Sequence, residues 1–279
     1  MNNEDQVEYW NGPAGQKWVD QSDRLDAMLA PFADTVIAHA GLQPDEFVMD
    51  IGCGAGALTL RAAAEAGPGQ GALGVDVSAP LISLARERAL AAGAPARFEL
   101  ADASTYMASP AADCVISRFG VMFFDDPAAA FANIRQSVRQ GGRLAFVCWQ
   151  ALTVNDWALA PLQAAMPFLK EAPAPADPTA PGPFAFQDKD RVARILSDAG
   201  WDDVMIDPVE TAIVLPGDDA MSTAGFMMQL GPLSRLLETQ GIDEAQVRDA
   251  LIQRLQQHKA ADGRVTMKSA CWRVTADNA

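Results

Sequence analysis

The chain has 279 residues, 49% of them hydrophobic, and a formal net charge of −15. This length suffices for one α/β domain with an appended cap, without a second complete domain. The acidic balance argues against a nucleic-acid partner and against an anionic membrane surface, because both would repel the protein.

The N-terminal residues and the cysteines indicate the cellular compartment and the state of the thiols. Residues 1–6 are polar and acidic where a signal peptide is basic and then apolar, and no apolar run is long enough for a membrane span. We therefore expect a cytoplasmic protein. The cysteines lack C-x-x-C spacing, which favours buried thiols, and we expect no metal site. They are Cys53, Cys114, Cys148 and Cys271.

The N-terminal segment contains three large aromatic residues within ten positions, Tyr9, Trp10 and Trp18. Such a concentration requires a burial partner elsewhere in the fold. The following stretch, 24–40, has the spacing of an amphipathic helix. We expect residues 1–45 to form an N-terminal helical cap.

Residues 46–150 alternate short apolar runs with alanine-rich stretches, a pattern typical of βαβ units and a parallel sheet. Predicted strands cover 46–51, 71–76, 96–100, 113–117 and 143–149, and predicted helices cover 55–66, 79–92 and 127–140. Ser78 and Asp126 precede two of these helices, and Gly67, Gly93 and Gly141 follow the three helices as expected ends.

The most informative motif lies at the end of the first predicted strand, where V-M-D-I-G-C-G-A-G-A-L covers residues 48–58. Three glycines there allow the backbone to turn tightly and to approach a ligand, and the next helix offers unpaired N–H groups. The same string satisfies the relaxed dinucleotide pattern G-x-G-x-x-A, so the glycines alone do not distinguish a dinucleotide from S-adenosylmethionine.

Three acidic residues lie at or just after the ends of successive predicted strands: Asp50, Asp76 and Asp102. Together with the run D-C-V-I-S-R-F-G-V-M-F-F at 113–124, this ordered set resembles the class I S-adenosylmethionine-dependent methyltransferases, over residues 48–150. In style it is nearest to the small-molecule group that includes the ubiquinone and menaquinone C-methyltransferases. The resemblance implies a Rossmann-like, doubly wound, seven-stranded α/β sheet with a terminal antiparallel strand.

The resemblance also implies cofactor contacts for these residues. Asp50 would lie at the methionine end, Asp76 and Val77 at the ribose, and Asp102 with Ala103 at the adenine. The glycine loop of Gly52, Cys53, Gly54 and Gly56 would pack against the cofactor, and Ser117, Arg118 and Phe119 would line its methyl-donor side. In that family an N-terminal segment folds across the cofactor, so Tyr9, Trp10 and Trp18 could close the pocket. For Trp18, simple docking of a helix on the sheet explains the residue equally well.

The remainder, residues 151–279, reads as substrate-side helices with the last two strands. We predict a helix over 186–200, strands over 201–215 and 265–275, and helical sequence over 217–260 that includes Asp243 as an N-cap. This helical insertion is interpreted as a lid, although for 243–258 packing on the sheet is the better explanation. Five prolines within 171–183 predict an extended surface connection.

The acceptor site is expected after the fifth strand, where polar and aromatic residues meet the carboxyl edge of the sheet. Trp149 and Trp157 could stack on a flat or cationic acceptor, and Asn155 or Asp156 could orient its polar atom. The alternative is a helix that Asn155 or Asp156 caps, with Trp157 in the core. His39 and His258 are interpreted as structural, so no catalytic base is assigned.

Three functions remain in view at this stage. The favoured one is methyl transfer from S-adenosylmethionine to a small-molecule acceptor by in-line displacement. An NAD(P)-dependent oxidoreductase would need a second nucleotide-binding half, which the sequence does not display. A non-catalytic sensor of S-adenosylmethionine would retain the same motifs. The sequence assigns no oligomeric state.

Overall fold

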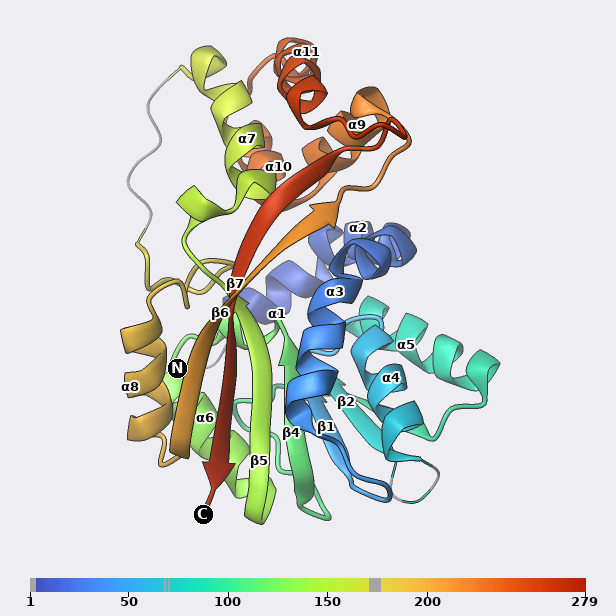
Figure 1. The fold of residues 1–279 in the computed structure, drawn as a ribbon, viewed down its shortest axis with the longest axis vertical. Coiled ribbons are helices and arrows are strands. Elements are labelled where there is room, and N and C mark those ends of the chain that lie inside the picture. Colours follow the sequence, from blue (N-terminus) through green and yellow to red (C-terminus); the bar gives the residue numbers. More distant parts are fainter. Residues whose placement is uncertain (1–3, 68, 70, 171–176) are drawn as a thin grey trace.

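A seven-stranded sheet with helices on both faces forms the centre of the structure (Figure 1). The structure is a computed structural model that describes residues 4–67, 69, 71–170 and 177–279. Helices α3, α4 and α5 cover one face, and α6 and α8 pack together on the other. None of the described helices combines the length and the apolar character needed to cross a membrane.

The strands run in the order β3-β2-β1-β4-β5-β7-β6. Strands β1 to β5 are parallel, and the last strand of the chain inserts antiparallel between β5 and β6. The prediction of a terminal antiparallel strand is confirmed, and this order differs from the all-parallel sheet of dinucleotide dehydrogenases. The bounds are β1 Val48–Ile51, β2 Ala72–Asp76, β3 Ala96–Leu100, β4 Ala112–Arg118, β5 Val138–Trp149, β6 Asp202–Val214 and β7 Thr266–Asn278.

Helices precede, alternate with and follow these strands. Their bounds are α1 Glu4–Asn11, α2 Pro13–Asp20, α3 Ser22–Ala40, α4 Ala57–Ala66, α5 Ala79–Ala92, α6 Pro127–Gln136, α7 Asp156–Ala165, α8 Lys189–Asp198, α9 Ala220–Gln229, α10 Gly231–Gln240 and α11 Glu244–Leu255. Short 3₁₀ turns occupy Val121–Phe123, Leu152–Val154, Met166–Phe168 and Gln256–His258. Gly67 and Gly93 end α4 and α5 as predicted.

The predicted helix over 127–140 is too long. Helix α6 ends at Gln136, and β5 already begins at Val138, which pairs with Ala112 of β4. The register then shifts before Arg143 pairs with Cys114, and Gly141, with a φ of 72°, lies within this irregularity. Gly141 therefore belongs to a bulged strand rather than to a helix end, because its left-handed backbone suits the bulge.

The helical insertion between β6 and β7 consists of α9, α10 and α11. Asp243 caps α11 by accepting a hydrogen bond from the N–H of Ala245, as predicted. The buried side chains of α11 face α7 and α9 rather than the sheet, which corrects the packing partner expected for 243–258. Residues 171–176 of the proline-rich connection lie outside the described residues, and 177–183 contain no helix.

Candidate active site

A cavity of about 250 Å³ lies beyond the carboxyl ends of the parallel strands, where open α/β sheets bind ligands. The loops after β1, β2, β3 and β4 supply one part of its wall. Helices α1, α2, α3, α7, α9 and α10 and the ends of β5 and β6 supply most of the remainder. Most of the predicted site residues line this cavity: Trp10, Trp18, Asp50, Gly52, Cys53, Gly54, Asp76, Val77, Asp102, Ala103, Arg118, Phe119 and Trp149.

Asp50 is the penultimate residue of β1, lies in the cavity wall and is 1% exposed. The hydroxyl of Thr59 donates to its Oδ2 at 2.6 Å, while Oδ1 has no hydrogen-bond partner among the described residues. Burial raises the pKa of Asp50 to about 7, against the opposing influence of the Thr59 hydrogen bond and the Arg118 charge. A buried acceptor without a donor is costly, so this atom marks a place for a ligand.

The Asp50→Asn variant tests this burial through its pH dependence. Because the folded-state pKa of about 7 exceeds the ordinary value of 3.8, the folded protein retains a proton that the unfolded chain releases. The free energy of unfolding of the parent should therefore fall as the pH rises through 7. Between pH 5 and pH 8 the parent should lose about 2–3 kcal/mol relative to Asp50→Asn.

Denaturant unfolding of both proteins at the two pH values measures that difference. Asparagine keeps an oxygen that can accept from Thr59 and carries no charge, so the comparison isolates ionisation. An equal difference in stability at both pH values would mean that Asp50 ionises as it does in the unfolded chain.

Asp76 ends β2 and ties two loops together. Its Oδ2 accepts from the N–H of Gly54 at 2.8 Å, and its Oδ1 accepts from the N–H of Ser78 at 2.9 Å. Burial raises the pKa of Asp76, and these backbone hydrogen bonds oppose that rise. Each carboxylate oxygen keeps a further lone pair, so the group can still accept from hydroxyls of a ligand in the cavity.

The three glycines of the loop have different roles. A Cβ on Gly52 would stand 2.6 Å from the Cα of Gly120, so this glycine permits close contact between two loops. A Cβ on Gly56 would collide with the ring of Phe98, and Gly56 does not line the cavity. Only at Gly54 does a Cβ meet no atom within 4 Å. Open space for a ligand therefore lies at Gly54, and Gly56 serves internal packing.

Ser117 and Tyr9 also lie away from the cavity lining. Ser117 is fully buried, donates to the carbonyl of Ile51 at 2.7 Å and accepts from the N–H of Gly120. It joins the loops after β1 and β4. Tyr9 is 49% exposed and packs edge-on against Trp10, which is the residue that reaches the cavity.

Asn155 is fully buried and connects α7 to β7 instead of entering the cavity. Its Oδ1 accepts from the N–H of Ala270 at 2.9 Å and from the indole of Trp157 at 3.2 Å, and its Nδ2 donates to the carbonyl of Ala270. It precedes α7 without a side-chain capping bond. The amide is thus used within the protein, which corrects the expectation of a substrate contact.

Asp102, Ala103 and Cys53 lie in the wall as predicted, with distinct surroundings. Asp102 follows β3 and accepts from the N–H of Ser104 at 2.8 Å. Ala103 and Cys53 are buried, and burial raises the pKa of the Cys53 thiol well above its usual value. A thiol in this state is a poor nucleophile, in agreement with a packing role for this cysteine.

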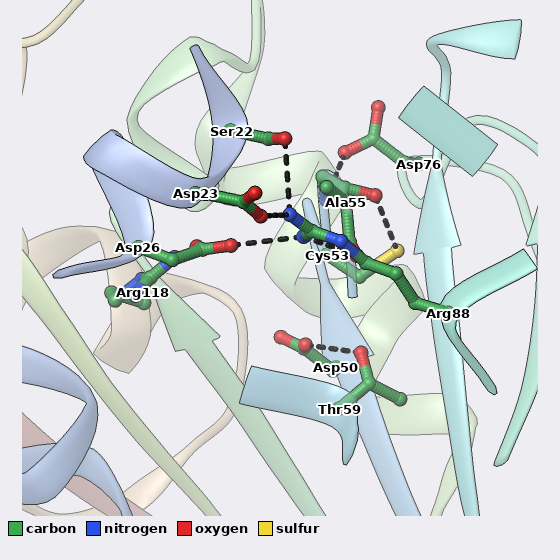
Figure 2. Close-up of polar contacts among 11 residues, drawn as sticks. Ser22, Asp23, Asp26, Asp50, Cys53, Ala55, Thr59, Asp76, Arg88 and Arg118 are labelled. Carbon is green, nitrogen blue, oxygen red and sulfur yellow. Dashed lines mark hydrogen bonds and ion pairs between the residues drawn. The ribbon is translucent and has the colours of Figure 1, made fainter. Parts of the chain in front are cut away.

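Sequence patterns missed Asp26 on α3. In Figure 2 its carboxylate lies between two guanidinium groups, accepting from Arg118 and from Arg88 at 2.9 Å each. Arg88 also donates to Ser22 and to the carbonyl of Ala55 in the glycine loop. This network attaches α3 to the cofactor-loop side of the cavity. Its members come from distant segments, and no local motif distinguishes Asp26 from the other acidic residues of its helix.

Helices α7, α9 and α10 provide an apolar wall, and the sequence indicated only the segment of α9 and α10 as a lid. Phe226, Met227 and Leu233 line the cavity, whereas no residue of α11 does. Trp157 lines it too, although a core position was the alternative for this residue. Helices α9 and α10 thus form the part of the insertion that covers the cavity.

The histidines and the metal-binding potential of the chain remain to be placed relative to this wall. Neither His39 nor His258 lines the cavity, and His39 contacts the carbonyl of Thr35 within its own helix. Over residues 4–67, 69, 71–170 and 177–279, no group of three or more histidine, cysteine, aspartate or glutamate side chains is arranged to hold a metal ion.

Comparisons with known proteins agree with this geometry. Residues 48–142 match the family described as "Methyltransferase domain". An uncharacterised protein of Mycobacterium tuberculosis is 30% identical over 125 residues, which cover 44% of this chain and 44% of that protein. Nocamycin O-methyltransferase of Saccharothrix syringae is 30% identical over 142 residues, which cover 48% of this chain and 49% of that enzyme. The matches thus span less than half the length of these relatives.

A solved structure extends the likeness over the whole fold. Phosphoethanolamine N-methyltransferase 2 of Haemonchus contortus, in complex with phosphomonomethylethanolamine and S-adenosylhomocysteine, has a TM-score of 0.61 at 14% identity. The alignment covers 100% of this chain and 61% of that enzyme. At this identity the likeness concerns the fold. Residues 48–142 thus resemble a methyltransferase domain, and the chain has a Rossmann-like seven-stranded fold.

Proposed function

We propose that the protein binds S-adenosylmethionine and transfers its methyl group to a small-molecule acceptor. The observation that carries this proposal is the convergence of Asp50, Asp76 and Asp102 on one cavity, beside the open space at Gly54. In this proposal residues 1–45 form a cap, 46–150 hold the cofactor, and 151–279 supply the acceptor side. The narrower likeness to ubiquinone-type enzymes stays a prediction.

The polar groups of the wall suit the cofactor in kind and in charge. Asp76 would accept from the ribose hydroxyls, and Asp102 would lie at the adenine. Asp50 and Arg118 would lie at the methionine end, where the unpartnered Oδ1 of Asp50 can accept a hydrogen bond. Four carboxylates and one guanidinium line the cavity, from Asp26, Asp50, Asp76, Asp102 and Arg118. This excess of negative charge favours a sulfonium cation.

Methyl transfer from an activated donor depends mainly on the positioning of donor and acceptor. When bound, S-adenosylmethionine supplies an activated methyl group: its carbon–sulfur bond breaks as the acceptor's electron pair forms the new bond, and a thioether remains. The protein has to align the acceptor and exclude water. Trp10 packs edge-on against both Trp18 and Phe123, with ring centroids 5.5 Å apart in each case. All three rings line the cavity and would shield it from solvent.

Calorimetric titration of the full chain with S-adenosylmethionine, S-adenosylhomocysteine and NADH tests the proposal. We expect binding of the two adenosyl compounds, at micromolar concentration, and none of NADH. Binding of NADH alone would overturn the assignment in favour of an oxidoreductase. Formation of S-adenosylhomocysteine in an acceptor screen then separates an enzyme from a sensor, which would bind the cofactor without consuming it.

A further inference from the structure

Charge is distributed unevenly over the cavity wall. The charged side chains that line it all lie on the cofactor half, defined as the loops after β1 to β4 together with Asp26 of α3. The opposite part, here called the acceptor half, is formed by the ends of β5 and β6 and by α7, α9 and α10. Among the side chains that the structure describes, those that line this half are all apolar or aromatic, and they include Trp149, Trp157, Leu215, Phe226, Met227 and Leu233.

The acceptor half therefore disfavours a charged acceptor. A carboxylate or phosphate that moved from water to this half of the cavity would have no opposite charge beside it among the described residues. The free-energy cost of its desolvation would therefore not be offset. A cation would need a free aromatic face. Phe119 stacks on Trp149 at 3.9 Å between centroids, and the rings of Phe32 and Trp157 also pack against this indole at 5.0 and 4.9 Å, so three neighbouring rings limit the face that Trp149 can offer to a cation. An uncharged acceptor avoids both costs.

Trp149 nevertheless offers one polar group to this half. Three other tryptophans donate their indole N–H within the protein: Trp157 to Asn155 at 3.2 Å, Trp201 to Phe131 at 3.1 Å, and Trp272 to Gln187 at 2.9 Å. Trp149 is 4% exposed and lines the cavity, yet no described residue accepts from its indole N–H. This N–H is not among the fully buried, unpartnered polar atoms of the described residues, so it retains accessible surface; because an indole N–H is only a donor, it can donate to an acceptor atom on a ligand. The indoles of Trp10 and Trp18 also have no described acceptor, but they line the cavity outside the acceptor half.

We propose that the methyl acceptor is an uncharged, largely apolar molecule with an oxygen that accepts a hydrogen bond from the indole N–H of Trp149. This inference rests on the proposed function, because it concerns the second ligand of the same cavity. Trp149 is thus a binding residue that selects for a carbonyl or comparable oxygen, and the surrounding apolar side chains select for a neutral, apolar body.

The test uses four naphthalene probes of similar size, titrated by ligand-observed NMR into the full chain saturated with S-adenosylhomocysteine. Acetylnaphthalene carries a neutral carbonyl, ethylnaphthalene lacks the oxygen, naphthoate is an anion, and naphthyltrimethylammonium is a cation. We expect the ketone to bind about 3- to 10-fold more tightly than the hydrocarbon, as for one neutral hydrogen bond. Both ions should bind at least roughly 10-fold more weakly than the ketone.

Two matched variants locate the oxygen contact. Trp149→Phe keeps an aromatic ring and removes the N–H, so the preference for ketone over hydrocarbon should fall to about 1. Trp272→Phe makes the same change on β7, outside the cavity lining, and the N–H of Trp272 is already used by the carbonyl of Gln187. It should leave the preference unchanged. Both variants should bind S-adenosylhomocysteine as the parent does.

The outcomes separate this inference from the proposed function. Tightest binding of either ion, an unchanged ketone preference in Trp149→Phe, or failure of all four probes in a protein that binds S-adenosylhomocysteine would overturn the inference alone. Failure to bind S-adenosylhomocysteine would overturn the proposed function as well.

Discussion

Gly54→Val is expected to weaken S-adenosylhomocysteine binding by roughly 100-fold, because a branched side chain would fill the space that the ligand needs. Gly54 lines the cavity, and a Cβ built on it meets no atom within 4 Å. The fold itself therefore leaves room for the new side chain, and the clash arises only with a ligand. Calorimetry on the purified variant measures the loss.

A glycine remote from the cavity provides the matched control. Gly93 ends α5 with a φ of 58°, close to the 54° of Gly54, and a Cβ there also meets nothing within 4 Å. Valine in the left-handed region costs about 1–2 kcal/mol of folding stability at either position. Gly93→Val should bind the ligand normally. Equal weakening in both variants would mean that lost stability, and not the cavity, explains the effect.

Asp76→Ala is expected to weaken the same ligand by about 2 kcal/mol or more, roughly 30-fold, because it removes a carboxylate placed to accept from two ribose hydroxyls. The variant also loses the hydrogen bonds from Gly54 and Ser78. Part of the effect could thus come from a loosened loop. Circular dichroism and the thermal midpoint should show that the variant is folded.

Comparison with the 2′,3′-dideoxy analogue of S-adenosylhomocysteine separates the two causes. If Asp76 accepts from the ribose, removing the hydroxyls should weaken binding to the parent and change little in Asp76→Ala. A full penalty for the missing hydroxyls in the variant would contradict the ribose assignment. Asp76→Asn, which keeps one acceptor oxygen, should fall between the parent and the alanine variant.

The sequence was sufficient for features that depend on local pattern. Parallel strands of a buried sheet are apolar and end at a common edge, so the positions of Asp50, Asp76 and Asp102 after successive apolar runs placed them on one side of the sheet. All three line the cavity. The same reasoning predicted the order of strands and helices within a few residues. The prediction that Gly141 ends a helix was wrong, because a β-bulge and a helix end both favour a glycine with left-handed backbone.

The local sequence pattern did not distinguish residues that line the cavity from residues of the same type that serve internal packing. Gly54 and Gly56 look equivalent in the sequence, yet one faces open space and the other faces the ring of Phe98. Asn155 stands beside the predicted acceptor site but is used by Ala270, more than a hundred residues away in the sequence. These assignments depend on which distant segment packs against each residue.

The sequence by itself thus determined the α/β class, the cofactor loop and its carboxylates, because strand ends and glycine turns are encoded by neighbouring residues. Only the tertiary structure decided that Asp26 of α3 joins Arg88 and Arg118, and that α9 and α10 close an uncharged wall around Trp149. The physical reason is that charge pairing and cavity lining arise from contacts between segments far apart in the chain, which no local periodicity records.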